Sequence, residues 1–221
     1  KGALIWSATP GAKSATNLAV KGLDDSMPAP VAAVDSNGDK IVDRLYATDT
    51  GGNIWRLDIP GNVLPDASQD KWSMFKFAKI GVDGKGSKNT PDDRRFYHAV
   101  DVVQTRDGGI NYDAIAIGSG NLSHPMQTTT TDRFYLFRDL EVNSSFHGSG
   151  GTAIPDPLVE SDLYDATADL VQVGTDSERT SAATSISKAK GWYITLEDKG
   201  EKSLSSSVTL GGMVFFTTFT P

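Results

Sequence analysis

The sequence predicts an all-β fold of the propeller type. Short segments rich in aliphatic and aromatic residues recur along the 221 residues, and turn signals such as Gly51-Gly52 and Gly211-Gly212 separate them. An aromatic strand, a glycine turn and a second aromatic strand repeat as a unit, which favours propeller blades over a sandwich or barrel. At about 40–50 residues per blade, the chain would supply roughly four to five blades. We therefore expect a partial set of blades.

The expected strands share a short length and a high content of β-branched and aromatic side chains. They are 4–7, 31–34, 44–48, 53–59, 72–80, 96–104, 112–118, 133–139, 192–196, 205–210 and 213–218. Polar and glycine-rich segments separate them, as expected for turns and loops.

The region of about 160–190 departs from this β pattern. Its first part begins with Ser161 as a candidate N-cap and then carries apolar side chains on one helical face, at Leu163, Ala166 and Leu170. Its second part, 177–190, is rich in Ala, Ser and Lys, and Gly191 follows as a candidate C-cap. We therefore expect a small helical insertion between blades.

The segment 35–43 carries the clearest chemical signal. The candidate ligands are the side chains of Asp35, Asn37, Asp39 and Asp43 and the backbone carbonyl of Ile41. Calcium takes about six to eight hard oxygen ligands in a tolerant geometry, and oxygen donors at alternate loop positions can supply them. The alternative is a polar turn without a metal, since Asp, Asn and Gly are common in turns. The spacing favours calcium.

This loop differs from an EF-hand. Its sixth position is Lys40 rather than Gly, and its twelfth is Tyr46 rather than a bidentate Glu. Expected strands flank it at 31–34 and 44–48, and a Gly-Gly turn leads to the next strand. The loop is therefore expected to join strands and to brace a hairpin.

Composition excludes several classes of function. The chain has 28 acidic against 21 basic residues, a net charge of −7, which argues against a nucleic-acid partner. It has no apolar run near the roughly 18 residues that span a bilayer, so no direct membrane span is expected. It has no cysteine, which excludes disulfides, cysteine zinc sites and thiol catalysis. A modest calcium site favours an exported protein, and both ends resemble cuts from a longer chain.

The sequence carries no pattern of a known catalytic site, and we expect no enzyme activity. His98, His124 and His147 lack metal-ligand spacing, and each is expected to be solvated or hydrogen-bonded. Two Gly-Ser-Gly segments lack the pattern of a nucleophile elbow. Two alternatives stay open: a quinoprotein-type propeller enzyme, in which calcium polarises a quinone, and a purely structural scaffold braced by calcium.

The residues 34–58, which contain the Asp-rich loop and the hairpin after it, resemble the blade motif of PilY/PilC-type type IV pilus tip proteins. The blocks 117–125, 131–139 and 190–194 agree with that family in the same order. The resemblance implies a quinoprotein-like, modified seven-bladed C-terminal β-propeller, to which 1–221 would belong as part of a single domain. The N-terminal region of such proteins would be absent from this chain.

The resemblance also implies a function. It implies Ca²⁺ held by the residues that match the family's loop, which are Asp35, Asn37, Asp39, Ile41 through its backbone, and Asp43. It further implies export through the periplasm to the pilus tip, cell surface or outer membrane of a Gram-negative bacterium. The implied roles are pilus biogenesis, control of pilus extension and retraction, twitching motility, adhesion and virulence. Pilin-like tip components and the host-cell surface are the candidate partners. One relative carries an Arg-Gly-Asp integrin motif, but this chain has Arg106-Asp107-Gly108, so no integrin binding is expected.

Overall fold

Two β-sheets contain most of the strand residues that the structure describes. A computed structural model describes residues 2–14, 16–59, 72–84, 88–142, 147 and 153–221. The first sheet contains β3 (Ala32–Val34), β4 (Arg44–Thr48), β5 (Asn53–Asp58) and β6 (Ser73–Lys79). Its strands are neighbours in chain order and all pairs are antiparallel. Such a four-stranded meander is the pattern of a propeller blade.

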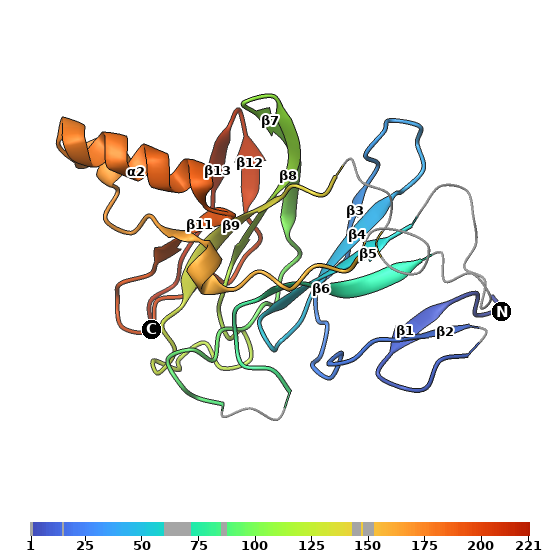
Figure 1. Ribbon diagram of the computed structural model, residues 1–221. Helices are drawn as coiled ribbons and strands as arrows, with labels where there is room; N and C mark the ends of the chain where they lie inside the picture. Colours follow the sequence, from blue (N-terminus) through green and yellow to red (C-terminus); the bar gives the residue numbers. More distant parts are fainter. Residues whose placement is uncertain (1, 15, 60–71, 85–87, 143–146, 148–152) are drawn as a thin grey trace.

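The second sheet lies beside the first (Figure 1). Its strands are β7 (Asp101–Asp107), β8 (Ile110–Gly118), β9 (Arg133–Asp139), β10 (Tyr164–Asp165) and β11 (Gly191–Thr195). Their order across the sheet is β10-β11-β9-β8-β7. The pairs β7–β8, β8–β9 and β9–β11 are antiparallel, whereas β10 pairs in parallel with β11.

Two small strand pairs complete the β structure. Near the N-terminus, β1 (Ser7–Thr9) pairs in parallel with β2 (Asn17–Ala19). Near the C-terminus, β12 (Val208–Leu210) and β13 (Met213–Phe215) form an antiparallel hairpin. The predicted Gly211-Gly212 turn connects the strands of this hairpin.

The predicted helical insertion is confirmed in its second part. Helix α2 spans Asp176–Lys188, and Thr175 caps it in a capping box with Glu178. The short helix α1 (Leu170–Val173) precedes it, and α2 lies on the side of the second sheet away from the first (Figure 1). Among the described residues, no helix is long and apolar enough to cross a bilayer.

The predicted helix over 161–170 is wrong. The chain there forms a 3₁₀ turn, Glu160–Asp162, followed by β10, which pairs with β11. The periodic apolar residue Leu163 is buried in the core between the sheets, so its burial does not require a helical face. The prediction failed because the strand that pairs with this segment comes from a distant part of the sequence.

Gly191 is not the C-cap of α2, because Ala189 holds that position. Gly191 instead begins β11 with a φ of 148°. A Cβ atom at this position would collide with the carbonyl oxygen of Leu136 in β9. The glycine therefore permits close approach of two strands.

Aromatic rings fill the core between the two sheets. Phe77 of β6 contacts Tyr46 of β4 and Phe137 of β9, with ring centroids 6.0 and 6.2 Å apart, both edge-on. Tyr135 and Ile115 are fully buried in the same cluster. Such edge-on aromatic pairs add to the stabilisation from burial.

Most of the regular secondary structure in the described residues is β-strand and little is helix, which confirms the all-β class. The described strands form separate sheets and do not close into a ring, so the propeller architecture stays a prediction. The assignment of 1–221 to a single domain also stays a prediction. The predicted strands 4–7, 96–104 and 205–210 are wrong in their first parts, because β1, β7 and β12 begin only at Ser7, Asp101 and Val208. The predicted strand 213–218 is wrong in its second half, because β13 ends at Phe215.

Candidate functional site

The Asp-rich segment 35–43 connects β3 to β4, as predicted. The register pairs Val34 with Arg44, so the two ends of the loop lie side by side. The amide of Asp43 donates to the carbonyl of Val34 over 2.9 Å, and the amide of Ile59 donates to the carbonyl of Asp43 over 2.7 Å. All predicted ligands therefore belong to one closed loop between adjacent strands.

The carboxylate of Asp35 organises the first half of this loop. Its Oδ1 accepts from the amide of Gly38 over 2.7 Å, and its Oδ2 accepts from the amide of Lys40 over 2.8 Å. Gly38 and Lys40 both have positive φ, 80° and 73°. Desolvation raises the pKa of Asp35, but the loop amides, led by Lys40, lower it more, so the carboxylate stays charged to lower pH than usual.

The remaining predicted ligands also bind backbone amides. Asn37 Oδ1 accepts from the amide of Asp39, and Asp39 Oδ1 accepts from the amide of Ile41, each over 2.8 Å. Asp43 Oδ2 accepts from the amide of Ser36 over 2.8 Å, which fastens the end of the loop to its beginning. The bonds that Asn37 and Asp39 accept, each from the amide two residues on, are those of consecutive Asx turns.

The donor set of the loop matches calcium in kind, since it consists only of carboxylate, amide and carbonyl oxygens. The observed hydrogen bonds also agree with the alternative of a polar turn. Within the described ranges, no group of three or more histidine, aspartate or glutamate side chains is close enough to hold a metal ion. Binding would require the carboxylates to draw together, and the calcium site stays a prediction.

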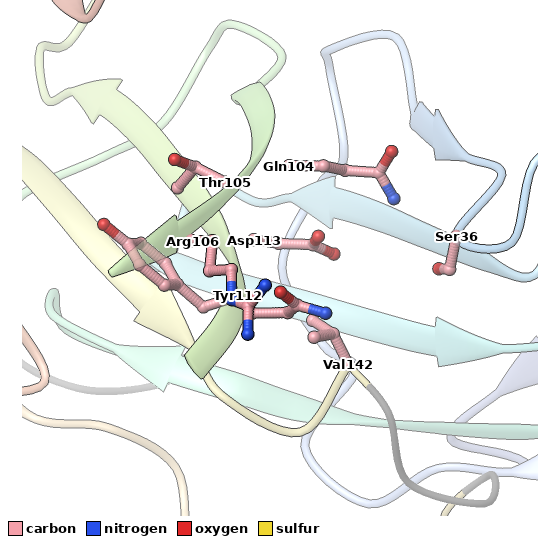
Figure 2. A pocket seen from close by; sticks show the side chains of 8 residues that line it. Ser36, Gln104, Thr105, Arg106, Tyr112, Asp113 and Val142 are labelled. Atoms are coloured by element: carbon pink, nitrogen blue, oxygen red, sulfur yellow. The ribbon is translucent and has the colours of Figure 1, made fainter. Parts of the chain in front are cut away.

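The loop contacts the second sheet through β7. Gln104 Nε2 donates to the carbonyl oxygen of Asp35 over 3.3 Å. Ser36 and Gln104 both line a polar pocket between the loop and the β7–β8 hairpin (Figure 2). The candidate metal loop is therefore part of the boundary between the two sheets.

A buried network of charged side chains joins the two sheets, and it starts at Arg44, the residue that follows the loop. Arg44 Nη1 donates to Asp113 Oδ2 of β8 over 2.6 Å. Arg56 Nη1 donates to Asp139 Oδ2 of β9 over 2.7 Å, and Arg56 Nε donates to Asp58 over 2.7 Å. Each of these side chains is at most 5% exposed. Breaking such buried ion pairs is strongly destabilising.

Tyr46 connects the acidic members of this network. Its hydroxyl donates to Asp139 Oδ2 over 2.6 Å and lies 3.1 Å from Asp113 Oδ2. Burial, reinforced by Asp139, raises the pKa of Tyr46 well above its usual range, so it stays protonated. Burial also raises the pKa of Asp113, although Arg44 opposes this. Burial raises the pKa of Asp58 too, but Arg56 and the hydrogen bonds from His147 together lower it more, so the net pKa lies below its ordinary value.

His147 also belongs to the network. Its backbone amide and its Nδ1 both lie close to Asp58 Oδ2, at 3.0 and 2.9 Å. The sequence predicts a solvated or hydrogen-bonded histidine here, and hydrogen bonding is what the structure shows.

Sequence reasoning did not single out the arginines and aspartates of the network. A signal was present, because Arg44 and Tyr46 on β4 and Arg56 and Asp58 on β5 occupy alternate positions. They form the cross-strand pairs Arg44–Asp58 and Tyr46–Arg56. Charged residues on one face of otherwise apolar strands indicate a buried polar contact.

Comparisons with known proteins are consistent with this architecture. No family model matches the chain. The chain is similar to the type IV pilus biogenesis factor PilY1 homolog of Xylella fastidiosa (strain Temecula1), with 23% identity over 220 residues, 96% of this chain and 14% of the relative. The chain therefore spans about one seventh of that relative.

A solved structure has a related fold. It is the C-terminal domain of Pseudomonas aeruginosa PilY1, with a TM-score of 0.54 and 20% identity, covering 86% of this chain and 44% of that chain. The sequence similarity and the related fold together confirm the resemblance to a PilY1-type C-terminal domain that the motif blocks predict.

Proposed function

We propose that this chain is the C-terminal-type domain of an exported, non-enzymatic type IV pilus biogenesis factor. The observation that carries the proposal is the similarity to a PilY1 homolog along 96% of the chain. The related fold of a PilY1 C-terminal domain supports it. The relative is named a type IV pilus biogenesis factor, and such a role places the protein in the cell envelope or outside the cell.

The proposed role of this domain is to regulate pilus extension and retraction, and through them twitching motility and adhesion to surfaces or host cells. Its proposed partners are pilin-like components of the pilus tip. The net charge of −7 supports a protein partner over a nucleic acid, since a nucleic-acid surface would be basic.

In this proposal calcium binds the loop 35–43 and braces it. An ion would neutralise Asp35, Asp39 and Asp43 and hold the connection between β3 and β4. Asp43 directly precedes Arg44, whose guanidinium binds Asp113 on the second sheet. An ordered loop would therefore fix Arg44 and the contact between the sheets.

Calcium should raise the melting temperature of the purified chain. A ligand that binds only the folded state stabilises it by about 2.7 kcal/mol at a hundredfold excess over its Kd. Asp43→Asn should weaken this response, because it removes a charged ligand but keeps an oxygen that can accept from the amide of Ser36. Thermal unfolding with calcium and with a chelator measures both effects.

The control for this experiment is Asp198→Asn, which changes an exposed aspartate in another turn. It should keep the full calcium response. Identical melting curves of the unaltered chain in calcium and in chelator would rule out the calcium site, while leaving the pilus role open.

In the bacterium, Asp35→Asn or Asp43→Asn in the full-length protein should change piliation or twitching. The expected reason is that a loose loop weakens the surface that opposes pilus retraction. Twitching zones and counts of surface pili measure the effect, with Asp198→Asn as the control. Unchanged motility in variants exported at normal levels would contradict a regulatory role for the loop. Unchanged piliation after deletion of the whole gene would contradict the pilus role itself.

A further inference from the structure

The pocket between the Asp-rich loop and the β7–β8 hairpin has a cavity volume of about 340 Å³. The register of the hairpin pairs Gln104 with Asp113 and Arg106 with Asn111. These are alternate positions on each strand, so the four side chains lie on one face of the ladder. Figure 2 shows Gln104 and Asp113 on one side of the pocket and Ser36 of the loop on the other. The pocket is therefore built mainly from polar side chains of two separate elements.

Several of these polar groups have unused hydrogen-bonding capacity. Among the described residues, the side chains of Arg106 and Asn111 form no hydrogen bond or ion pair. Ser36 Oγ is buried and has no partner. Asp113 is 1% exposed, and its contacts with Arg44 and with the Tyr46 hydroxyl both fall on Oδ2, so Oδ1 has no described partner. Buried polar groups without partners are unusual in folded proteins, and a bound ligand can supply the missing bonds.

The chemistry of these groups limits the kind of ligand. Arg106 offers only donors, Asp113 Oδ1 only an acceptor, and Asn111 and Ser36 offer both. An anion would meet the carboxylate of Asp113, and a cation would meet the guanidinium of Arg106. An apolar ligand would leave Ser36 Oγ buried and unpaired, which is unfavourable. A neutral molecule with several hydroxyl groups satisfies all of these groups, because each hydroxyl both donates and accepts.

We propose that this pocket binds a saccharide. Its volume lies at the small end of the range of about 300–1,000 Å³ for ligand sites, which suits a terminal sugar unit rather than a long chain. The planar groups of Gln104, Arg106, Asn111 and Asp113 supply paired donors and acceptors for neighbouring hydroxyls. This inference does not depend on calcium binding or on a role in the pilus.

The test is binding of the purified chain to a glycan array, followed by titration of the best sugar by calorimetry or ligand-observed NMR. Ser36→Ala and Arg106→Ala should each weaken binding about five- to tenfold, as expected for loss of one or two hydrogen bonds. Neither side chain makes a hydrogen bond to a described residue, so neither substitution removes such a bond from the fold. Arg179→Ala, an exposed arginine on α2, should leave binding unchanged.

Measurements in calcium and in chelator separate this site from the metal loop. Saccharide binding that persists in chelator supports the proposal whatever the outcome for calcium. Absence of any glycan ligand would overturn it, and so would binding that both pocket variants leave intact. Zwitterionic ligands carry both charges and could also pair with Arg106 and Asp113, and a panel of free amino acids tests for them. If the chain binds an amino acid but no sugar, the proposal is overturned.

Discussion

Replacing Arg56 by methionine is expected to lower the free energy of unfolding by about 3–5 kcal/mol, the range for removing one partner of a buried ion pair. The Arg56 side chain is 2% exposed and donates to Asp139 and Asp58 over 2.7 Å each. It also donates through Nη2 to the carbonyl of Glu141 over 3.1 Å. Methionine fills most of the volume but leaves two buried carboxylates with one cation fewer. Desolvated charges without partners explain the large expected loss.

Urea unfolding followed by circular dichroism measures this loss. Arg106→Met is the matched control, because Arg106 is exposed and has no ion pair among the described residues, and its effect should stay within about 0.5 kcal/mol. If Arg56→Met does not fold, Arg56→Lys keeps the charge with fewer donors and should show a smaller, measurable loss. A loss below about 1 kcal/mol for Arg56→Met would mean that the network does not hold the sheets together.

The same network should make stability depend on pH. Burial raises the pKa of Asp58, but Arg56 and the hydrogen bonds from His147 together lower it more, to below its ordinary value of 3.8. A lowered pKa in the folded state gives stability that is present above the ordinary pKa and is lost as pH falls through the folded value. Asp113 acts in the opposite direction, because burial raises its pKa and its ionised form is disfavoured in the fold. Arg56→Met should therefore reduce the part of the acid sensitivity that comes from Asp58, while the hydrogen bonds from His147 keep the rest.

The sequence predicts best those strands that have a strong local pattern. The expected ranges 44–48 and 133–139 coincide with β4 and β9. Apolar and aromatic residues are concentrated in both ranges, and such a short run is a local signal for a strand. The predictions failed where distant contacts decide the structure. Phe96 was assigned to a strand, but it is buried against Tyr135, with ring centroids 6.3 Å apart, before β7 begins.

In the candidate site too, the sequence predicts the part that depends on local spacing and misses the part that depends on distant contacts. The Asp-rich loop could be predicted because all of its oxygen donors lie within nine consecutive positions. The network behind it could not, because Arg44 and Asp113 are 69 residues apart and Arg56 and Asp139 are 83 apart. No local spacing connects such pairs. The pocket likewise forms only when the fold brings Ser36 against the β7–β8 hairpin.

The turn between β4 and β5 should prove as important to stability as the contact between the sheets. Asp49 is fully buried there, and its carboxylate accepts from the amides of Gly51 and Asn53 over 2.9 and 3.0 Å. It also accepts from the Asn53 side chain over 3.0 Å and from Trp55 Nε1 over 2.6 Å. Burial raises the pKa of Asp49, and the bonds from Trp55 and Asn53 oppose this. The carboxylate is thus the common acceptor that holds the turn to the following strand.

Asp49→Ala should lower the free energy of unfolding by about 3 kcal/mol, because buried donors left without an acceptor lose roughly 1–3 kcal/mol each. Asp49→Asn should lose less, since one oxygen remains, although its NH₂ group would face Trp55 Nε1–H. A double-mutant cycle with Trp55→Phe isolates the bond to the indole, because Trp55→Phe should cost less stability when Asp49 is already alanine. Asp198→Ala, in an exposed turn, is the control. If Asp49→Ala unfolds at the same urea concentration as the unaltered chain, the turn is held instead by the backbone of Gly52, whose φ is 73°.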